Sequence, residues 1–255
     1  RKNLEKQNPD IVIAHCSREI VLTFLACLFM KKNIIGYIHS DPKKLIKEKS
    51  KIWLVLTYIS FSLITHCIVF SREARNKLPI LAKKKSLIIP NVSSENKYIK
   101  KNYTQKNIIM VGSLINIKNH EFVINNFEKI VKKFPNWKLS IIGDGPLKLY
   151  LKKIIIKKKL SKNIFLLGNK KNIFNYYRKS SIFLLSSISE GMNLSLIEAI
   201  KCGMPVISSD CSLSHKKLIV HNQNGYLFNL KSNNQFIKYL IKLIKNEKIR
   251  KKFGS

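Results

Sequence analysis

Arginine is scarce in this sequence, although basic residues are abundant. Only six of the 48 lysine and arginine residues are arginine, there are 14 acidic residues, and the formal net charge is +34. Arginine is the side chain best suited to bidentate contacts with phosphates and base edges. Because the lysines are scattered among isoleucine and asparagine, and no RNA-binding motif or zinc finger is present, the charge favours a nucleic-acid-binding domain only weakly. Lysine-rich faces would also hold a protein against an anionic membrane.

Cysteines are few and do not form a recognisable pattern. The five cysteines are odd in number and have neither a CxxC motif nor a Cys/His ligand spacing. We therefore predict neither a disulfide framework nor a metal site, and a reducing compartment is the natural setting. The expected location is cytoplasmic, and peripheral contact with the inner face of the membrane stays open.

Glycine-rich nucleotide loops are also missing. Gly143-Asp144-Gly145 is not a dinucleotide fingerprint, because Lys148 occupies the position of the third glycine and no acidic partner is evident. No Walker loop is present. These absences argue against a nicotinamide enzyme and a P-loop NTPase.

One apolar run comes close to the length of a membrane span. Residues 52–70 contain 19 residues without a formal charge, and a spanning helix needs about 20. His66, two threonines and two serines interrupt the run, and residues 67–70 have the pattern of a short buried strand. We therefore predict an apolar helix followed by a strand.

The chain has the alternating pattern of an α/β protein. Its 255 residues can bury one large core or two smaller ones. The polar segment 92–106 has no hydrophobic period and separates a domain at 1–91 from a domain at 107–255. Buried strands are predicted at residues 11–15, 33–38, 67–70, 86–89, 108–111, 139–142, 164–167, 182–185, 206–208 and 225–228, with helices that include 20–30, 193–201 and 234–245. Because the chain begins without Met and ends directly after a basic helical run, we interpret it as a fragment.

The stretch SSISEGMNLSLIEAIKCGMPVISSD, residues 186–210, carries the clearest chemical signal. It reads as a loop and a helix that begins near Asn193, so that the amide groups from Met192 to Leu196 lack intrahelical acceptors. Gly191 lets an anion approach these amides, which is the usual geometry of a phosphate site. Glu190 and Glu198 would accept hydrogen bonds from sugar and ribose hydroxyls on either side of a diphosphate. A nucleotide diphosphate sugar has this shape, although an ordinary helix with solvated glutamates has the same spacing.

The run EGMNLSLIEAIKCGMPVISSD resembles the signature of the retaining family 4 glycosyltransferases. The resemblance implies the GT-B fold, in which two Rossmann-like domains face each other across a cleft. It also implies transfer of a hexose or amino-hexose from a nucleotide diphosphate sugar to a hydroxyl of a glycan or lipid-linked glycan, without a cofactor. In this scheme Glu198 holds the ribose, the amides from Gly191 through Met192 and Asn193 to Leu194 hold the diphosphate, and Glu190 orients the sugar.

Three further positions follow from the same resemblance. The segment GYIHSD places His39 at the end of strand 33–38, where these enzymes have a histidine that reaches the transferred sugar. Gly112 and Lys118 match a glycine-arginine pair and a later lysine that grip the diphosphate in the family. Ser113 occupies the arginine position, which removes one positive charge from the expected site.

Three other functions stay open at this point. A non-catalytic or degenerate glycosyltransferase-like subunit would explain Ser113. A nucleotide-sugar epimerase would convert free donor without an acceptor. A basic nucleic-acid-binding protein is favoured by net charge only.

Overall fold

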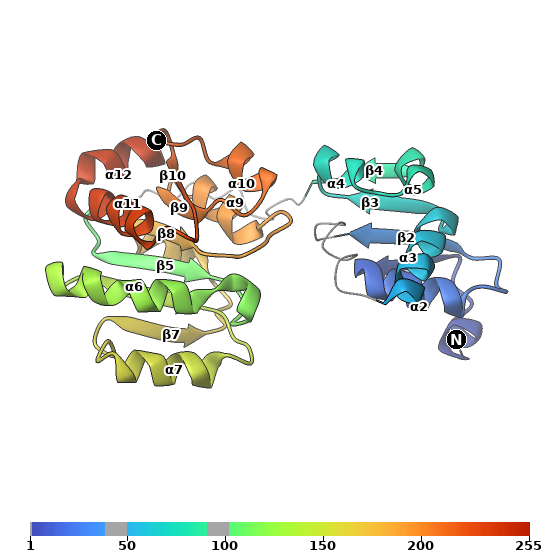
Figure 1. Ribbon diagram of the computed structural model, residues 1–255, viewed down its shortest axis with the longest axis horizontal. Coiled ribbons are helices and arrows are strands. Elements are labelled where there is room, and N and C mark those ends of the chain that lie inside the picture. Colours follow the sequence, from blue (N-terminus) through green and yellow to red (C-terminus); the bar gives the residue numbers. More distant parts are fainter. Residues whose placement is uncertain (1, 39–49, 91–101) are drawn as a thin grey trace. The chain divides into compact units, whose positions relative to one another are not determined.

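The structure, a computed structural model, describes residues 2–38, 50–90 and 102–255. The chain divides into two compact units. The first comprises Arg1–Val92 with Glu190–Met192, and the second comprises Ser93–Ser189 with Asn193–Ser255. Each unit contains its own parallel sheet with helices packed against it (Figure 1). Most of the linker that we predict at 92–106 lies outside the described residues.

The first unit is built on a four-stranded parallel sheet in the order β1-β2-β3-β4. Its strands follow one another across the sheet, so right-handed crossovers put the connecting helices on one face. Side chains on that face, among them Ile34, Ile38 and Val69, form its core with Ile20 and Phe61 from the helices. The elements of this unit are α1 (Lys2–Gln7), β1 (Ile11–His15), α2 (Cys16–Ala26), β2 (Asn33–Ile38), α3 (Lys51–Leu63), β3 (His66–Val69), α4 (Arg72–Asn76), α5 (Ile80–Lys84) and β4 (Ser86–Ile88).

The apolar run of the first unit folds as a helix and a strand, as predicted. Helix α3 begins after Ser50, whose hydroxyl accepts a hydrogen bond from the Trp53 amide at 3.4 Å, and it ends at Leu63. Strand β3 follows at His66. Within the described ranges no helix is long and apolar enough to cross a membrane.

The second unit is built on a six-stranded parallel sheet in the order β10-β9-β8-β5-β6-β7. Its strands are almost entirely apolar, as expected of a sheet that is buried on both faces. The elements of this unit are β5 (Asn107–Val111), the 3₁₀ turn η1 (Asn116–Lys118), α6 (His120–Lys133), β6 (Lys138–Ile142), α7 (Lys148–Lys157), β7 (Ile164–Gly168), α8 (Phe174–Arg178), β8 (Ile182–Leu185), α9 (Leu194–Lys201), β9 (Val206–Ser209), α10 (Leu213–Leu218), β10 (Gly225–Phe228), α11 (Asn233–Lys245) and α12 (Glu247–Gly254).

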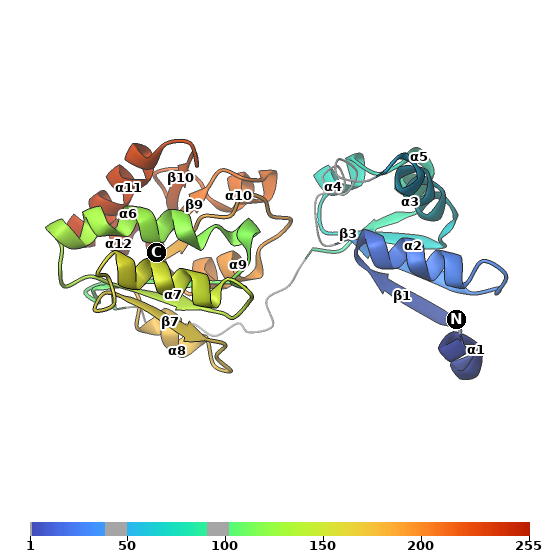
Figure 2. The ribbon, with the colours of Figure 1, turned by 60° about the horizontal axis from the view of Figure 1, so that its bottom comes forward.

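Helices cover both faces of this second sheet. Side chains of α6, α7, α11 and α12 form one core with it, and side chains of α8 and α9 form another on the opposite face. Figure 2 shows α6 and α7 in front of the sheet. The strand order reverses between β5 and β8, so the helices that follow these two neighbouring strands leave on opposite faces. This is the doubly wound Rossmann-like arrangement that we predict for the second domain.

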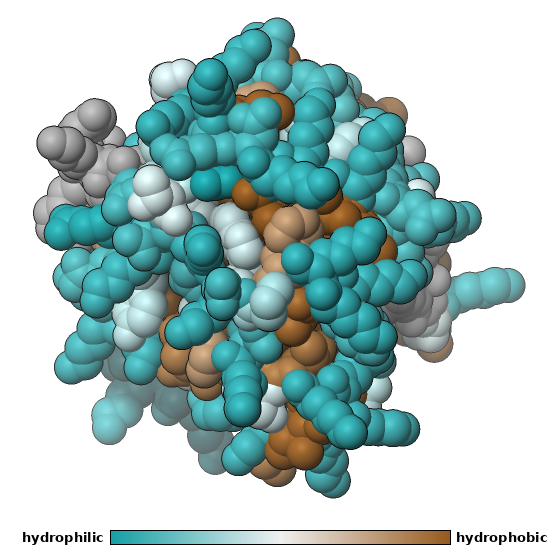
Figure 3. Space-filling view, turned by 90° about the vertical axis from the view of Figure 1, so that its left-hand side faces the viewer, coloured by the Kyte–Doolittle hydropathy of each residue, from teal (hydrophilic) through white to brown (hydrophobic). Residues whose placement is uncertain are grey.

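The lysines of the second unit lie on its surface. Figure 3 shows hydrophilic side chains projecting from most of the face that it presents, with hydrophobic residues visible between them. On each amphipathic helix the apolar stripe packs inward and the lysines point outward, as for Phe236 and Leu240 against Lys238 on α11. The large positive charge is therefore a property of the surface.

The strands agree with the sequence prediction within one or two residues, but some helices differ. The helix that we predict at 20–30 is α2, Cys16–Ala26, which starts directly after β1 at Cys16 with φ +68°. The prediction is wrong at both ends because no capping residue precedes the apolar run and the chain turns at Cys27. The short helices α1, α5, α8 and α10 are missing from the prediction, since five or six residues show too little of a helical period.

Candidate functional site

The candidate site lies in the second unit, at the carboxyl ends of β5 and β8. Open α/β sheets bind ligands outside the strand ends at the point where the strand order reverses. Gly112 and Ser113 follow β5 directly, and α9 begins at Leu194 in the segment after β8. The structure thus places the predicted residues Gly112, Ser113, Lys118, Asn193, Leu194 and Glu198 in one unit at this switch point.

The start of α9 is fixed by two polar side chains. The Asn193 side chain, which is buried, accepts hydrogen bonds from the Leu196 amide at 3.0 Å and from the Ser195 hydroxyl at 2.7 Å. Ser195 Oγ also lies 3.0 Å from the Val111 carbonyl oxygen at the end of β5. Because the cap uses the Leu196 amide, the amides of Leu194 and Ser195 are the ones left without an intrahelical acceptor. A rigid pair of amides therefore stands beside the end of β5.

The segment between β5 and α6 is held against the segment after β8. Ser186 donates its hydroxyl to the carbonyl oxygens of Lys118 and Asn119 at 3.1 and 2.8 Å, and the Ile188 amide donates to the Ile117 carbonyl at 2.8 Å. A Cβ atom added to Gly112 would lie 3.5 Å from Cδ and Cε of Lys118. The Lys118 side chain therefore passes over Gly112.

A second glycine loop, residues 143–145, packs against the segment that follows β5. Gly143 follows β6 with φ +139°, and a Cβ atom there would lie 2.0 Å from the Gly112 carbonyl oxygen. The loop then bonds to Leu114, whose amide donates to the Asp144 carbonyl at 2.9 Å. The Lys148 ammonium pairs with the Asp144 carboxylate at 2.7 Å. This loop is thus a packing element of the site, and Lys148 has a structural partner in it.

Glu198 has a partner that the sequence analysis missed. The Tyr177 hydroxyl on α8 donates to Glu198 Oε2 at 3.0 Å and lies 3.4 Å from the Ser195 carbonyl oxygen. Burial, followed by the charge of Glu198 and this hydrogen bond, raises the pKa of Tyr177, so its hydroxyl stays protonated and remains a donor. The bond orients the Glu198 carboxylate on α9. No local motif marks Tyr177, which lies 21 residues from its partner.

Some predicted site residues are not brought together by the structure. His39 lies outside the described residues. Glu190, Gly191 and Met192 are grouped with the first unit. Ser113 is exposed at the start of the segment after β5. The roles given to these residues stay predictions.

In the part of the chain that the structure describes, no three His, Cys, Asp or Glu side chains are grouped so that they could hold a metal ion. All five cysteines are free.

His120, at the start of α6, gives the site a pH-dependent stability. Its side chain is 3% exposed, and Nδ1 has no hydrogen-bond partner among the residues that the structure describes. Burial, with a smaller contribution from the charge of Lys118, lowers the pKa of His120 from 6.5 to about 4. The His120 imidazole is therefore protonated below pH 6.5 in the unfolded chain, whereas in the folded chain it is protonated only below about pH 4.

We expect this histidine to cost stability in acid. Above pH 6.5 this histidine does not lower the free energy of unfolding. As the pH falls from 6.5 toward 4, the free energy of unfolding decreases by up to about 1.4 kcal/mol per pH unit, because the unfolded chain takes up the proton first. Urea denaturation of the protein and of His120→Met across this range should give profiles that diverge in acid, with the variant flatter. Parallel profiles would show that His120 titrates normally in the folded protein.

Comparison with known proteins adds to this geometry. Residues 91–255, more than half of the chain, match the family described as Glycosyl transferases group 1. An uncharacterized glycosyltransferase of Methanocaldococcus jannaschii is 31% identical over 250 residues, which cover 88% of this chain and 61% of the relative. The alpha-monoglucosyldiacylglycerol synthase of Acholeplasma laidlawii is 31% identical over 180 residues, covering 64% of this chain and 44% of the relative. The chain thus spans less than two thirds of the length of these relatives.

Solved structures share the fold over almost the whole chain. TarM of S. aureus, in a complex that contains UDP, superposes with a TM-score of 0.82 at 23% identity and covers 99% of this chain and 52% of its own. Anabaena HepE, in complex with UDP and glucose, gives a TM-score of 0.83 at 16% identity and covers 100% of this chain and 74% of its own. At these identities the likeness shows the fold, which confirms the predicted fold class.

Proposed function

We propose, since this chain belongs to the glycosyl transferases group 1 family, that it transfers a hexose or amino-hexose from a nucleotide diphosphate sugar to a hydroxyl of a glycan or lipid-linked glycan. The observation that carries the proposal is the fixed start of α9. Asn193 and Ser195 hold it against the end of β5, and Lys118 crosses Gly112 in the segment that follows β5. Amides and an ammonium group in this arrangement suit a diphosphate.

In this proposal each part of the donor contacts a different group of residues. The diphosphate lies at the amides of Leu194 and Ser195 and is neutralised by Lys118. The ribose hydroxyls donate to Glu198, whose carboxylate Tyr177 orients. UDP is the first candidate among nucleotides, because the TarM and HepE structures were determined with UDP. The proposal includes no cofactor and no metal ion.

The proposed reaction exchanges one bond at the anomeric carbon. The bond between this carbon and the diphosphate oxygen breaks, and the bond to the acceptor oxygen forms on the same face of the sugar, so configuration is retained. The departing diphosphate takes the proton of the acceptor hydroxyl. The amides at the start of α9 and Lys118 stabilise the negative charge that grows on the leaving group. Glu190 and His39 orient the sugar in this scheme.

The acceptor and the location belong to the same proposal. The Acholeplasma laidlawii relative is named for the synthesis of a glucosylated diacylglycerol, and a lipid-linked acceptor would place this protein on the cytoplasmic face of a membrane. Its part in the cell is then the synthesis of a surface polysaccharide or glycolipid. The surplus of lysine favours such a surface if it carries anionic lipids.

The serine at position 113 favours a second candidate function. It stands exposed where the family resemblance expects an arginine that grips the diphosphate. A glycosyltransferase-like subunit without catalysis would tolerate this loss, whereas an enzyme would need Lys118 or another lysine to supply the charge. The two candidates differ in whether the protein binds donor.

Calorimetric titration with UDP, GDP and ADP tests the proposal. We expect one diphosphate to bind, and Glu198→Ala to weaken it by about 1 kcal/mol or more, because hydrogen bonds to a charged acceptor are lost. Tyr177→Phe should weaken it less, since the carboxylate remains but is less well oriented. Glu128→Ala is the matched control, because the partners of Glu128 on α6 within the described part of the chain are the lysines Lys132 and Lys158.

Two results would decide against an active donor site. Equal losses from Glu198→Ala and Glu128→Ala would remove Glu198 from the site. A folded protein that binds none of the three diphosphates, but binds one after Ser113→Arg, would show a degenerate site and support the non-catalytic subunit.

A further inference from the structure

Helix α7 carries an unusual density of lysine for one short element. Seven lysines lie on it and in the turns that follow: Lys148, Lys152, Lys153, Lys157, Lys158, Lys159 and Lys162. Two of them are paired, Lys148 with Asp144 at 2.7 Å and Lys158 with Glu128 at 3.4 Å. The other five have no ion pair among the residues that the structure describes. This part of the surface therefore has an uncompensated positive charge.

The same helix exposes large apolar side chains. Leu149 is 73% exposed and Ile156 is 57% exposed, while Leu151 and Ile155 on the inner face are buried in the core. Positions 149, 152, 153 and 156 share one face of a helix, because residues three and four apart are neighbours. Two aliphatic side chains and two lysines thus point outward together. Solvated lysines alone would explain the charge, but they do not explain why leucine and isoleucine stand among them.

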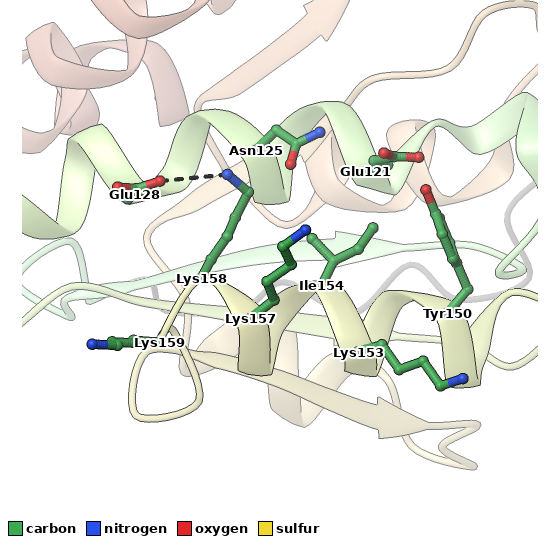
Figure 4. Close-up of a pocket in the computed structure, with 9 residues that line it drawn as sticks. All are labelled: Glu121, Asn125, Glu128, Tyr150, Lys153, Ile154, Lys157, Lys158 and Lys159. Carbon is green, nitrogen blue, oxygen red and sulfur yellow. Dashed lines mark hydrogen bonds and ion pairs between the residues drawn. The ribbon is translucent and has the colours of Figure 1, made fainter.

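A groove runs beside this face, between α6 and α7. It has a volume of about 760 Å³ and is lined by Asn125 from α6 and by Ile154, Lys153, Lys157 and Lys159 from α7 and the turn after it. Figure 4 shows the lining side chains, with the ion pair between Lys158 and Glu128 drawn across the groove.

The two glutamates of the groove already have partners. Hydrogen bonds from Lys132 and Lys158 lower the pKa of Glu128. On the α7 side Tyr150, 46% exposed, bonds to Glu121, and this bond raises the pKa of the tyrosine. Of the lysines without a carboxylate partner, Lys157 points into the space between α6 and α7 and remains available to an anion there, whereas the ammonium groups of Lys153 and Lys159 point away from it (Figure 4).

The position of α7 relates this surface to the candidate site. In a parallel sheet each helix begins at the edge where the preceding strand ends. The residue before α7, Leu147, donates its amide to the Leu114 carbonyl at 3.1 Å, and Leu114 belongs to the segment after β5 that carries Gly112 and Lys118. Leu149 therefore lies near the edge of the second unit that holds the candidate site, and the lysines extend away from it.

We propose that the outer face of α7, with the α6–α7 groove, is the surface by which this protein docks on an anionic lipid bilayer. Leu149 and Ile156 enter the boundary between headgroups and acyl chains, Lys152 and Lys153 lie against the anionic surface, and Lys157 holds a headgroup phosphate at the groove. A nucleic acid would satisfy the lysines but offers no apolar layer to the two aliphatic side chains. The inference deepens the proposed function by naming the surface that brings the site to a lipid-linked acceptor, and it rests on that function for this purpose only.

Sedimentation with vesicles tests the docking surface without donor or acceptor. Vesicles of phosphatidylcholine with and without phosphatidylglycerol are mixed with the protein, with a variant carrying K152E, K153E and K157E, and with a control carrying K238E, K245E and K248E. The control makes the same change in net charge on α11 and α12. The lysines of these two helices are exposed, whereas their large apolar side chains are not. A third variant carries L149S and I156S.

We expect the protein to prefer the anionic vesicles. The α7 lysine variant should lose about a hundredfold or more in partition coefficient, since each of its three lysines contributes about a fivefold factor near such a surface, and the control should lose clearly less. The serine variant should lose about tenfold or more, because its apolar side chains no longer enter the interface. UDP binding should be the same in all four proteins.

Several results would overturn this proposal and leave the transferase proposal untouched. One is a wild-type protein that shows no preference for anionic vesicles. Another is an equal loss in the α7 variant and the control, which would mean attraction by net charge alone. A third is a pair of findings: the L149S and I156S variant binds vesicles normally, and the wild-type protein binds duplex DNA through the α7 lysines with steep salt dependence. These would make the face a polyanion site.

Discussion

Replacing Gly143 with alanine is expected to abolish nucleotide binding and to destabilise the second unit. The added Cβ would lie 2.0 Å from the carbonyl oxygen and 2.8 Å from the carbonyl carbon of Gly112, and φ is +139°. Both clashing atoms belong to the backbone of the segment that carries Lys118, so the strain cannot relax through a flexible side chain. We expect a loss of more than about 2 kcal/mol in the free energy of unfolding, measured by urea denaturation, together with the loss of UDP binding.

Gly168→Ala is the control for this substitution. Gly168 also has a positive φ, +67°, but a Cβ atom there would meet only Asp144 Oδ2, at 3.9 Å. Its cost should be about 1 kcal/mol, the ordinary cost of a left-handed conformation, and UDP binding should persist. Similar effects from the two variants would mean that the contact between the two glycine loops is unimportant.

Replacing Arg250 with alanine is the second change with a large expected effect. Its guanidinium, 4% exposed, donates to the carbonyl oxygens of Tyr103, Leu243 and Ile244 at 2.5 to 3.0 Å and lies 5.4 Å from the ring of Trp137. Alanine leaves these carbonyl groups without donors in a buried place. We expect a loss of about 3 kcal/mol or more in the free energy of unfolding, read from urea denaturation.

Two further variants give this prediction its controls. Arg250→Lys should recover only part of the loss, because an ammonium group cannot reproduce the planar fork of donors. Arg178→Ala removes an exposed arginine from the same unit and should change stability by less than about 0.5 kcal/mol. If Arg250→Ala were as mild as Arg178→Ala, the hydrogen bonds from α12 would not hold this unit together.

Arg250 also connects the end of the chain to the back of the candidate site. The Tyr103 segment that it holds donates a hydroxyl to the Gly203 carbonyl at 2.9 Å, and Gly203 lies in the turn that ends α9. A Cβ atom on Gly203 would lie 2.7 Å from the Gly254 carbonyl oxygen, so α12 packs tightly on this turn. Residues distant in the sequence thus pack against the turn that ends α9, the helix that carries Glu198.

Much of the second unit could be predicted because its signals are local. Short apolar runs bounded by glycine, asparagine, proline or serine identify the strands from β5 to β10. Asn193 precedes an apolar helix, so its capping role follows from ordinary capping rules. Gly112 and Lys118 are six residues apart in one segment, and the structure brings them into contact. Local sequence was sufficient wherever the partners lie within one loop or helix.

The rest depends on contacts between distant segments, which no local pattern encodes. Tyr177 reaches Glu198 from another helix, and Ser195 reaches Val111 across 84 residues. Arg250 reads as one more exposed basic residue at the end of a lysine-rich chain, although the structure buries it. His120 looks like a polar residue at a helix start, and only the packing of α6 shows that it is buried.

Hydrogen–deuterium exchange with and without UDP tests the central claim most directly. If the switch point between β5 and β8 holds the nucleotide, UDP should slow amide exchange in residues 112–119 and 193–198 and leave the outer face of α7 unchanged. Glu198→Ala should reduce this protection at the same UDP concentration. Protection confined to other segments, such as the groove between α6 and α7, would contradict the account and place the nucleotide elsewhere.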